Sequence, residues 1–246
     1  MIMLYSGTPR SGKSLHIARN IRNWLTYGFP VICNFPIATD KIARKRAEFQ
    51  YIPNLKLTPR MLIDYSNAYF KDKKFSISKK EGHIKIVIDE AQRIFNARDW
   101  GRQGRSDWLE FFTLHGHLGF DIILIAQFDR MLDRQIRALI EYEYIHRKMS
   151  NFGYKGKIIT ALALGELFIA VKVWYPMREK VGSECFRKHK KYYAIYNTHA
   201  SIEEFDKSVS TDGSCSPAPS RLSLEDGGQG DPSDGDGSAG TAGALT

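Results

Sequence analysis

The segment from residue 7 to residue 14 constrains the fold of this chain more than any other stretch. It has the sequence GTPRSGKS, which fits the pattern G-x-x-x-x-G-K-[ST] without a mismatch. Residues 2–5 are apolar and predict a buried strand before it, and apolar residues at helical spacing follow it. The pattern binds phosphate when a strand precedes the glycine-rich turn and a helix follows it, and both flanks are present here.

We expect this segment to bind the phosphates of a nucleotide. Backbone N–H groups of the turn and of the helix start converge on one spot, and Gly7 and Gly12 let the backbone approach the ligand closely. Lys13 is expected to reach the β- and γ-phosphates, and the Ser14 hydroxyl to hold Mg²⁺. A turn that matches by chance is the alternative, which the flanking strand and helix disfavour. The expected nucleotide-binding residues are Gly7, Thr8, Pro9, Arg10, Ser11, Gly12, Lys13, Ser14 and Leu15.

A second apolar run, residues 84–88, predicts a strand that ends in Asp89 and Glu90. Asp89 at the strand tip is expected to hold Mg²⁺ through water, opposite Ser14. Glu90 is expected to act as the general base that polarises the attacking water. Two solvated acids at the end of a strand are the alternative. The phosphate-binding segment disfavours that alternative, because the two patterns are independent of each other.

A third strand is predicted over residues 121–126 and ends in Gln127. A carboxylate directly after the Mg²⁺ aspartate is typical of the additional-strand ATPases, which predicts one more strand between the two site strands. We assign Gln127 as a residue that senses the γ-phosphate or orients water, with an ordinary core strand as the alternative. Lys13, Glu90 and Gln127 are thus the expected catalytic residues. The predicted fold class is α/β, a P-loop NTPase of the additional-strand type with a mostly parallel sheet flanked by helices.

The stretch between the last two strands carries candidates for sensing or for acting on a neighbouring subunit. The two histidines in it stand at i and i+2 across a glycine and have no carboxylate or thiol ligand beside them, so a zinc site is not expected. Contact with the γ-phosphate, with DNA or with another subunit stays open for them, as does simple packing. The candidates are Arg98, Arg102, Arg105, His115 and His117.

The remaining elements are predicted from apolar spacing alone. The late strands are expected to extend the sheet in antiparallel fashion. Their aromatic residues lie among lysines and arginines, a mixture that can stack on single-stranded nucleic acid, although core aromatics beside surface lysines are commoner. The strands are expected over residues 30–35, 141–148, 167–175 and 191–196, and the helices from residue 59 and over residues 131–140.

Charge divides the chain into two parts. Residues 201–246 hold nine acidic side chains against Lys207 and Arg221, a net charge of −7, whereas the whole chain carries +9 and residues 1–200 therefore +16. The basic part favours an anionic partner, which can be a nucleotide, nucleic acid or a membrane surface. The composition predicts one globular domain over residues 1–205 and a disordered acidic tail rich in Ser, Gly and Asp over residues 206–246.

Cysteine usage and hydropathy bear on location. Three cysteines without a C-x-x-C pair indicate a reducing compartment. We expect no signal peptide, because the first strand begins almost at Met1, and no membrane span, because no apolar run reaches about 18 residues. The expected location is the cytoplasm.

With these motifs in view, the sequence resembles the zonular occludens toxin (Zot)-like family, which includes the assembly ATPases of filamentous phages. The resemblance covers about residues 1–200 and rests most specifically on residues 115–127, HGHLGFDIILIAQ. It rests also on the phosphate-binding segment, on IDEAQ at residues 88–92, and on YNTH at residues 196–199. It implies an ATP- and Mg²⁺-dependent ATPase of the DNA-translocase-like branch. In the family this domain powers assembly and extrusion of filamentous phage at the host inner membrane.

The resemblance implies partners as well. These are further copies of the chain in a ring, phage assembly or coat proteins, and single-stranded DNA. The family usually has a basic residue between the two histidines, where this chain has Gly116, so an arginine finger would have to come from Arg98, Arg102 or Arg105, or be absent. Family members commonly carry a membrane span after the ATPase domain. Contact with the membrane would here pass through a partner or the basic surface.

Two other functions stay open from the sequence. A small-molecule or nucleotide kinase would use the same phosphate-binding segment, with residues 98–105 as its lid. A secreted toxin-like effector would carry the nucleotide fold only by inheritance. The expected lack of a signal peptide and the odd number of cysteines disfavour the effector.

Overall fold

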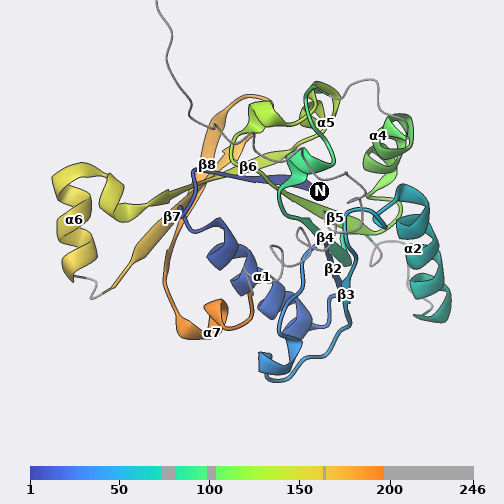
Figure 1. The fold of residues 1–246 in the computed structure, drawn as a ribbon, viewed down its shortest axis with the longest axis horizontal. Helices are drawn as coiled ribbons and strands as arrows, with labels where there is room; N and C mark the ends of the chain where they lie inside the picture. The colour runs from blue at the N-terminus through green and yellow to red at the C-terminus, as the bar shows by residue number, and fades with distance from the viewer. Residues whose placement is uncertain (74–80, 99–103, 163–164, 197–246) are drawn as a thin grey trace, which may run out of the picture.

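An eight-stranded sheet forms the centre of the protein, with helices on both of its faces (Figure 1). The computed structural model describes residues 1–73, 81–98, 104–162 and 165–196. The strands are β1 (Ile2–Ser6), β2 (Val31–Cys33), β3 (Phe49–Tyr51), β4 (Ile84–Ile88), β5 (Phe120–Ile125), β6 (Tyr142–Lys148), β7 (Leu167–Trp174) and β8 (Glu179–Arg187). The α-helices are α1 (Lys13–Tyr27), α2 (Pro59–Lys73), α4 (Arg105–Leu114), α5 (Arg134–Ala138), α6 (Gly153–Leu162) and α7 (Lys190–Tyr193). Short 3₁₀ turns are η1 (Thr39–Lys41), η2 (Ala91–Arg93), η3 (Asp129–Met131) and η4 (Met149–Asn151).

The strand order is β3-β2-β4-β5-β1-β6-β7-β8. β5 lies between β1 and β4 and is parallel to both, with Ile122 beside Ile2 on one side and beside Ile86 on the other. β6 is parallel to β1, whereas the pairings of β6 with β7 and of β7 with β8 are antiparallel. The predicted parallel sheet, its additional strand between the two site strands and its late antiparallel extension are therefore confirmed.

Alternate side chains of the strands build one core on each face of the sheet. Ile2 and Leu4 of β1 belong to the core that α2 and α4 cover. Met3 and Tyr5 belong to the core that α1 covers. β1, β4 and β5 are buried on both faces, which explains why their sequences are continuous apolar runs.

The prediction of a strand over residues 191–196 is wrong. This stretch contains α7, which begins where the His189 side chain accepts a hydrogen bond from the N–H of Lys191. Tyr192 and Ile195 then pack into the core beside α1. Their spacing of three suits a helical turn, and this packing outweighs the strand propensity of the tyrosines. The last strand is β8 instead, most of whose side chains are exposed, so its sequence lacks an apolar alternation.

The helices differ less from prediction. α2 begins at Pro59, as expected. The helix expected over residues 131–140 is shorter, because Asp133 caps α5 by accepting a hydrogen bond from the N–H of Gln135 at 2.7 Å. Within the described ranges, no helix has both the length and the apolar character needed to cross a bilayer. The acidic tail predicted over residues 206–246 lies outside the described residues.

Candidate functional site

The phosphate-binding segment connects β1 to α1, as predicted. Gly7 and Gly12 have φ angles of 140° and 97°, which disfavour any residue with a side chain. Both are also crowded. A Cβ at Gly7 would lie 2.5 Å from the His146 carbonyl oxygen, and a Cβ at Gly12 would lie 2.6 Å from the Phe168 ring. The loop therefore requires glycine at both positions on two independent grounds.

Lys13 is the first residue of α1 and folds back over the loop. Its Nζ donates hydrogen bonds to the carbonyl oxygens of Gly7, at 2.5 Å, and Thr8, at 3.1 Å. Burial lowers the pKa of Lys13, while the carboxylates of Asp89 and Glu90 act in the opposite direction. An ammonium group held against the loop is suited to bind a phosphate chain.

Asp89 lies at the tip of β4, where three residues hold it in place. Asn34 accepts a hydrogen bond from the Asp89 N–H at 2.7 Å and donates one to the Asp89 carbonyl oxygen at 2.8 Å. The N–H of Glu90 donates to Asp89 Oδ1 at 2.9 Å, and the Tyr196 hydroxyl donates to Oδ2. Burial raises the pKa of Asp89, and the bonds from Tyr196 and Glu90 oppose that shift.

Ser14 and Asp89 offer the kind of oxygen ligands that Mg²⁺ prefers. The Tyr196 hydroxyl donates a hydrogen bond to Asp89. Burial raises the pKa of Tyr196, and the Ser14 side chain acts in the opposite direction. A hydroxyl next to the phosphate-binding lysine and a carboxylate at the end of a neighbouring strand fit the metal of a nucleotide site.

Glu90 and Gln127 lie at the same edge of the sheet as the loop. Glu90 has a φ of 48°, a strained conformation for a residue with a side chain, and its carboxylate accepts a hydrogen bond from the Gln92 side chain. The Gln127 carbonyl oxygen accepts a hydrogen bond from the N–H of Gly7 at 3.1 Å. The three sequence motifs meet because the carboxyl ends of neighbouring parallel strands share one edge, where ligands of such sheets bind.

A buried pair of histidines lies directly behind the loop. His146 Nδ1 is 3.1 Å from the Ser6 carbonyl oxygen and therefore carries a proton, and its Nε2 is 2.9 Å from His16 Nδ1. Each histidine is only 1% exposed. Burial lowers the pKa of His146 to about 3, so near pH 7 its Nε2 is free to accept the proton of His16. The pair ties α1 to β6 beneath the glycine turn.

A cavity of about 260 Å³ adjoins the loop on the side of β6. Gly7, Thr8 and Gln127 line it together with the buried Glu143. Glu143 accepts hydrogen bonds from the Ser6 hydroxyl at 2.6 Å and from Arg178 at 2.8 Å. Phe128 and Ile145 also line the cavity, so it combines apolar walls with a few polar groups, as small-molecule sites do.

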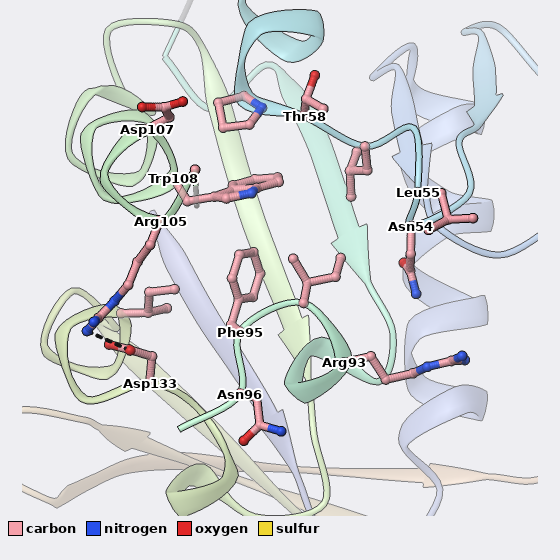
Figure 2. Close-up of a pocket in the computed structure, with 15 residues that line it drawn as sticks. Asn54, Leu55, Thr58, Arg93, Phe95, Asn96, Arg105, Asp107, Trp108 and Asp133 are labelled. Atoms are coloured by element: carbon pink, nitrogen blue, oxygen red, sulfur yellow. Dashed lines mark ion pairs between the residues drawn. The ribbon is translucent and has the colours of Figure 1, made fainter. Parts of the chain in front are cut away.

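A larger cavity, of about 490 Å³, lies between α2, α4 and η2 (Figure 2). Phe95 and Trp108 are among its apolar lining, and Figure 2 shows Arg93 on the opposite side from the Arg105–Asp133 ion pair. Among the described residues that line it, Arg105 alone was expected at the functional site. Neither the phosphate-binding segment nor Asp89, Glu90 or Gln127 lines this cavity.

The three predicted arginines differ in their surroundings. The Arg105 guanidinium is 2.7 Å from the Asp133 carboxylate, so it braces α4 against α5. Arg98 is exposed to solvent, and Arg102 lies outside the described residues. A role toward a neighbouring subunit stays a prediction for all three, and the ion pair makes Arg105 less available for it than Arg98.

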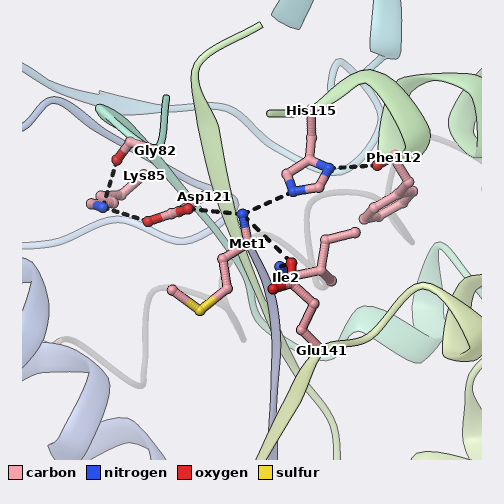
Figure 3. Close-up of polar contacts among 8 residues, drawn as sticks. All are labelled: Met1, Ile2, Gly82, Lys85, Phe112, His115, Asp121 and Glu141. Carbon is pink, nitrogen blue, oxygen red and sulfur yellow. Dashed lines mark hydrogen bonds and ion pairs between the residues drawn. The ribbon is translucent and has the colours of Figure 1, made fainter. Parts of the chain in front are cut away.

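His115 lies at the edge of the sheet opposite the loop (Figure 3). Its Nε2 is 2.9 Å from the Met1 ammonium group, which also lies 3.0 Å from Asp121 at the start of β5. The predicted contact of His115 with the γ-phosphate of its own subunit is therefore wrong. His115 lies where β1 and β5 begin, whereas the phosphate-binding loop lies where these strands end. His117 is exposed nearby, and contact with DNA or another subunit stays a prediction for both histidines.

Sequence reasoning missed Asn34 and Tyr196 as residues of the site. Asn34 follows β2, the strand beside β4, so a search for polar residues at strand ends could have found it. Tyr196 comes from a stretch whose predicted secondary structure is wrong. Its only signal in the sequence was its place among the motifs of the family resemblance.

Comparisons with known proteins agree with this geometry. The family model described as zonular occludens toxin (Zot) matches residues 1–201. The chain is 34% identical over 169 residues to the gene 1 protein of Enterobacteria phage I2-2, covering 68% of this chain and 46% of that protein. It is 25% identical over 157 residues to the gene 1 protein of Escherichia phage If1, covering 61% and 42%. The chain thus spans less than half the length of these two relatives.

The chain also resembles solved structures in its fold. One solved ATPase domain superposes with a TM-score of 0.51 at 7% identity, covering 80% of this chain and 84% of that one. Together with β5 between β1 and β4 and the loop after β1, this likeness shows a P-loop NTPase fold of the additional-strand type.

Proposed function

The chain belongs to the zonular occludens toxin (Zot) family, and from this premise we propose that it is an Mg²⁺-dependent ATPase motor that powers the assembly and extrusion of filamentous phage. One observation carries the proposal. The phosphate-binding loop, the Asp89-Glu90 pair and Gln127 follow three adjacent parallel strands, with Gln127 on the middle one. The loop alone indicates phosphate binding. The Asp89-Glu90 pair and Gln127, the polar residue at the end of the middle strand, supply the further groups that hydrolysis needs.

We propose one role for each part of the site. The N–H groups of the loop and the Lys13 ammonium group bind the phosphates. Ser14 and Asp89 would hold Mg²⁺, which neutralises charge on the phosphate oxygens when it is bound. The Glu90 carboxylate accepts a proton from the attacking water. Gln127 contacts the γ-phosphate, so the position of β5 responds to whether this phosphate is bound.

Partners are proposed from the family and from charge. We propose a ring of identical subunits that acts on phage assembly or coat proteins in the host cytoplasm, at the inner face of the inner membrane. The charge of +16 on residues 1–200 suits single-stranded DNA or an anionic membrane surface as a further contact. ATP and Mg²⁺ are the proposed substrate and cofactor.

Substitution of the proposed base tests the activity. Glu90→Gln keeps the size and polarity of the side chain but removes its ability to accept a proton. We expect ATP binding within about threefold of wild type and hydrolysis reduced by about 10²–10⁴-fold, the usual contribution of a general base. Binding of a fluorescent ATP analogue and release of phosphate measure the two quantities. Wild-type turnover in this variant would remove Glu90 from the mechanism.

Two controls separate the motor from other activities. Lys13→Ala should lose both binding and hydrolysis, whereas Lys180→Ala, which changes an exposed side chain on β8, should keep both. Phosphate release from ATP without any acceptor distinguishes hydrolysis from kinase chemistry. Hydrolysis stimulated by single-stranded DNA, together with a native mass several times that of the chain, supports a ring that acts on DNA. Hydrolysis that DNA does not change would indicate that the motor acts on a protein substrate.

A further inference from the structure

Tyr196, the last residue that the structure describes, lies beside Asp89, one of the two residues proposed to hold Mg²⁺. Its hydroxyl donates a hydrogen bond to Oδ2 of Asp89, 107 residues away in sequence. The Tyr196 ring packs against Phe35 with the ring centroids 4.9 Å apart. The ring therefore anchors the side chain, while the hydroxyl faces the site.

The backbone around Tyr196 is held without help from the hydroxyl. Tyr196 forms a β-bridge with Ile37, and the N–H of Ala38 donates to the Ile195 carbonyl oxygen at 2.9 Å. Ile195 is fully buried in the core beside α1. None of these contacts involves the phenol oxygen, so a change to phenylalanine removes the hydrogen bond to Asp89 and leaves the anchoring intact.

We propose that Tyr196 is a positioning residue for the metal-binding aspartate, a proposal that rests on the proposed ATPase function. Asp89 Oδ1 accepts from the N–H of Glu90 and Oδ2 accepts from Tyr196, so the plane of the carboxylate is fixed at both oxygens. Each carboxylate oxygen can accept more than one hydrogen bond, so Oδ2 keeps an acceptor site for a water on the metal. Asn34 holds only the backbone of Asp89, so Tyr196 is the side chain that orients the carboxylate, together with the N–H of Glu90.

The proposal predicts a specific loss of metal affinity in Tyr196→Phe. Donors that orient a metal-binding carboxylate typically change metal affinity by about 10–100-fold. We therefore expect the Mg²⁺ concentration that half-saturates binding of a fluorescent, non-hydrolysable ATP analogue to rise by about tenfold or more. Binding of the same analogue in EDTA should not change, because the loop and Lys13 are untouched. Tyr192→Phe on α7 is the matched control, since it removes a phenol oxygen from the same segment away from Asp89.

A double substitution tests whether Tyr196 acts through Asp89. In an Asp89→Asn background, Tyr196→Phe should change the Mg²⁺ requirement by less than about twofold, because partners in one interaction are not additive. An unchanged or lowered Mg²⁺ requirement in the single variant, with its EDTA binding intact, overturns the positioning role. If wild type binds no nucleotide at all, the proposed function itself fails. The full chain is used throughout, and circular dichroism confirms that each variant is folded.

Discussion

Gly12 shows how a single residue shapes the nucleotide site. It has a φ of 97° and lies against Phe168 of β7, so this strand crowds the start of α1. We expect Gly12→Ala to lower the free energy of unfolding by about 2–4 kcal/mol, from backbone strain together with overpacking. Urea denaturation followed by circular dichroism measures the change.

Gly28 supplies the matched control for this prediction. It ends α1 with a φ of 93°, close to that of Gly12, but a Cβ there meets nothing within 4 Å. Gly28→Ala should therefore show the backbone strain alone, about 1–2 kcal/mol. Equal losses in the two variants would mean that the contact with Phe168 has no energetic weight.

At the scale of elements, Arg178 fastens the antiparallel extension to the site. It lies in the turn between β7 and β8, and its guanidinium binds Glu143 of β6 at 2.8 Å and Asp129 of η3 at 2.7 Å. The Tyr175 ring packs against it, with the ring centroid 4.0 Å from the guanidinium carbon. η3 follows Gln127 by one residue, so this turn is linked to the end of β5.

We expect Arg178→Ala to destabilise the protein by about 1–2 kcal/mol. The substitution leaves the Glu143 carboxylate, whose side chain is 6% exposed, without its charged partner. The half-exposed position of Arg178 keeps the loss below that of a fully buried pair. Hydrogen exchange should also quicken in β7 and β8. Lys180→Ala, an exposed change on the same hairpin, should stay within about 0.5 kcal/mol of wild type by chemical denaturation, and a similar loss there would contradict the assignment.

The elements of the site were predictable because each strand is buried on both faces. β1, β4 and β5 are continuous apolar runs that end in polar residues, and local sequence therefore located the loop, Asp89, Glu90 and Gln127. β8 and α7 were missed, because β8 is exposed and α7 depends on packing against α1. Tyr196 could not be placed for the same reason, since its position depends on contacts with residues far away in sequence.

At the scale of the whole molecule, the buried histidines make stability depend on pH. Burial lowers the pKa of His146 to about 3 in the folded protein, against about 6.5 in the unfolded chain. The unfolded chain therefore binds a proton below about pH 6.5 that the folded protein does not. The contribution is present above that pH and is lost as pH falls from about 6.5 toward 3. Between pH 7 and 5, His146 alone should lower the free energy of unfolding by about 2 kcal/mol.

Denaturation with urea at several pH values tests this dependence. His146→Gln removes the titrating ring and should flatten the slope between pH 7 and 5. His117→Gln changes an exposed histidine and should leave the slope as it is. A slope of unfolding free energy against pH in His146→Gln equal to that of wild type would contradict this prediction.

The position of β1 at the centre of the sheet has a consequence for synthesis on the ribosome. β1 pairs with β5 and β6, so its two neighbours are translated more than 110 residues after it. The nascent chain therefore carries an apolar strand with two open edges until residues 120–148 have emerged. Unpaired strands of this kind favour association between chains, so translation speed and chaperones should govern the yield of this domain more than its final stability does. Tyr196 emerges later still, so its hydrogen bond to Asp89 forms only after all eight strands of the sheet have been synthesised.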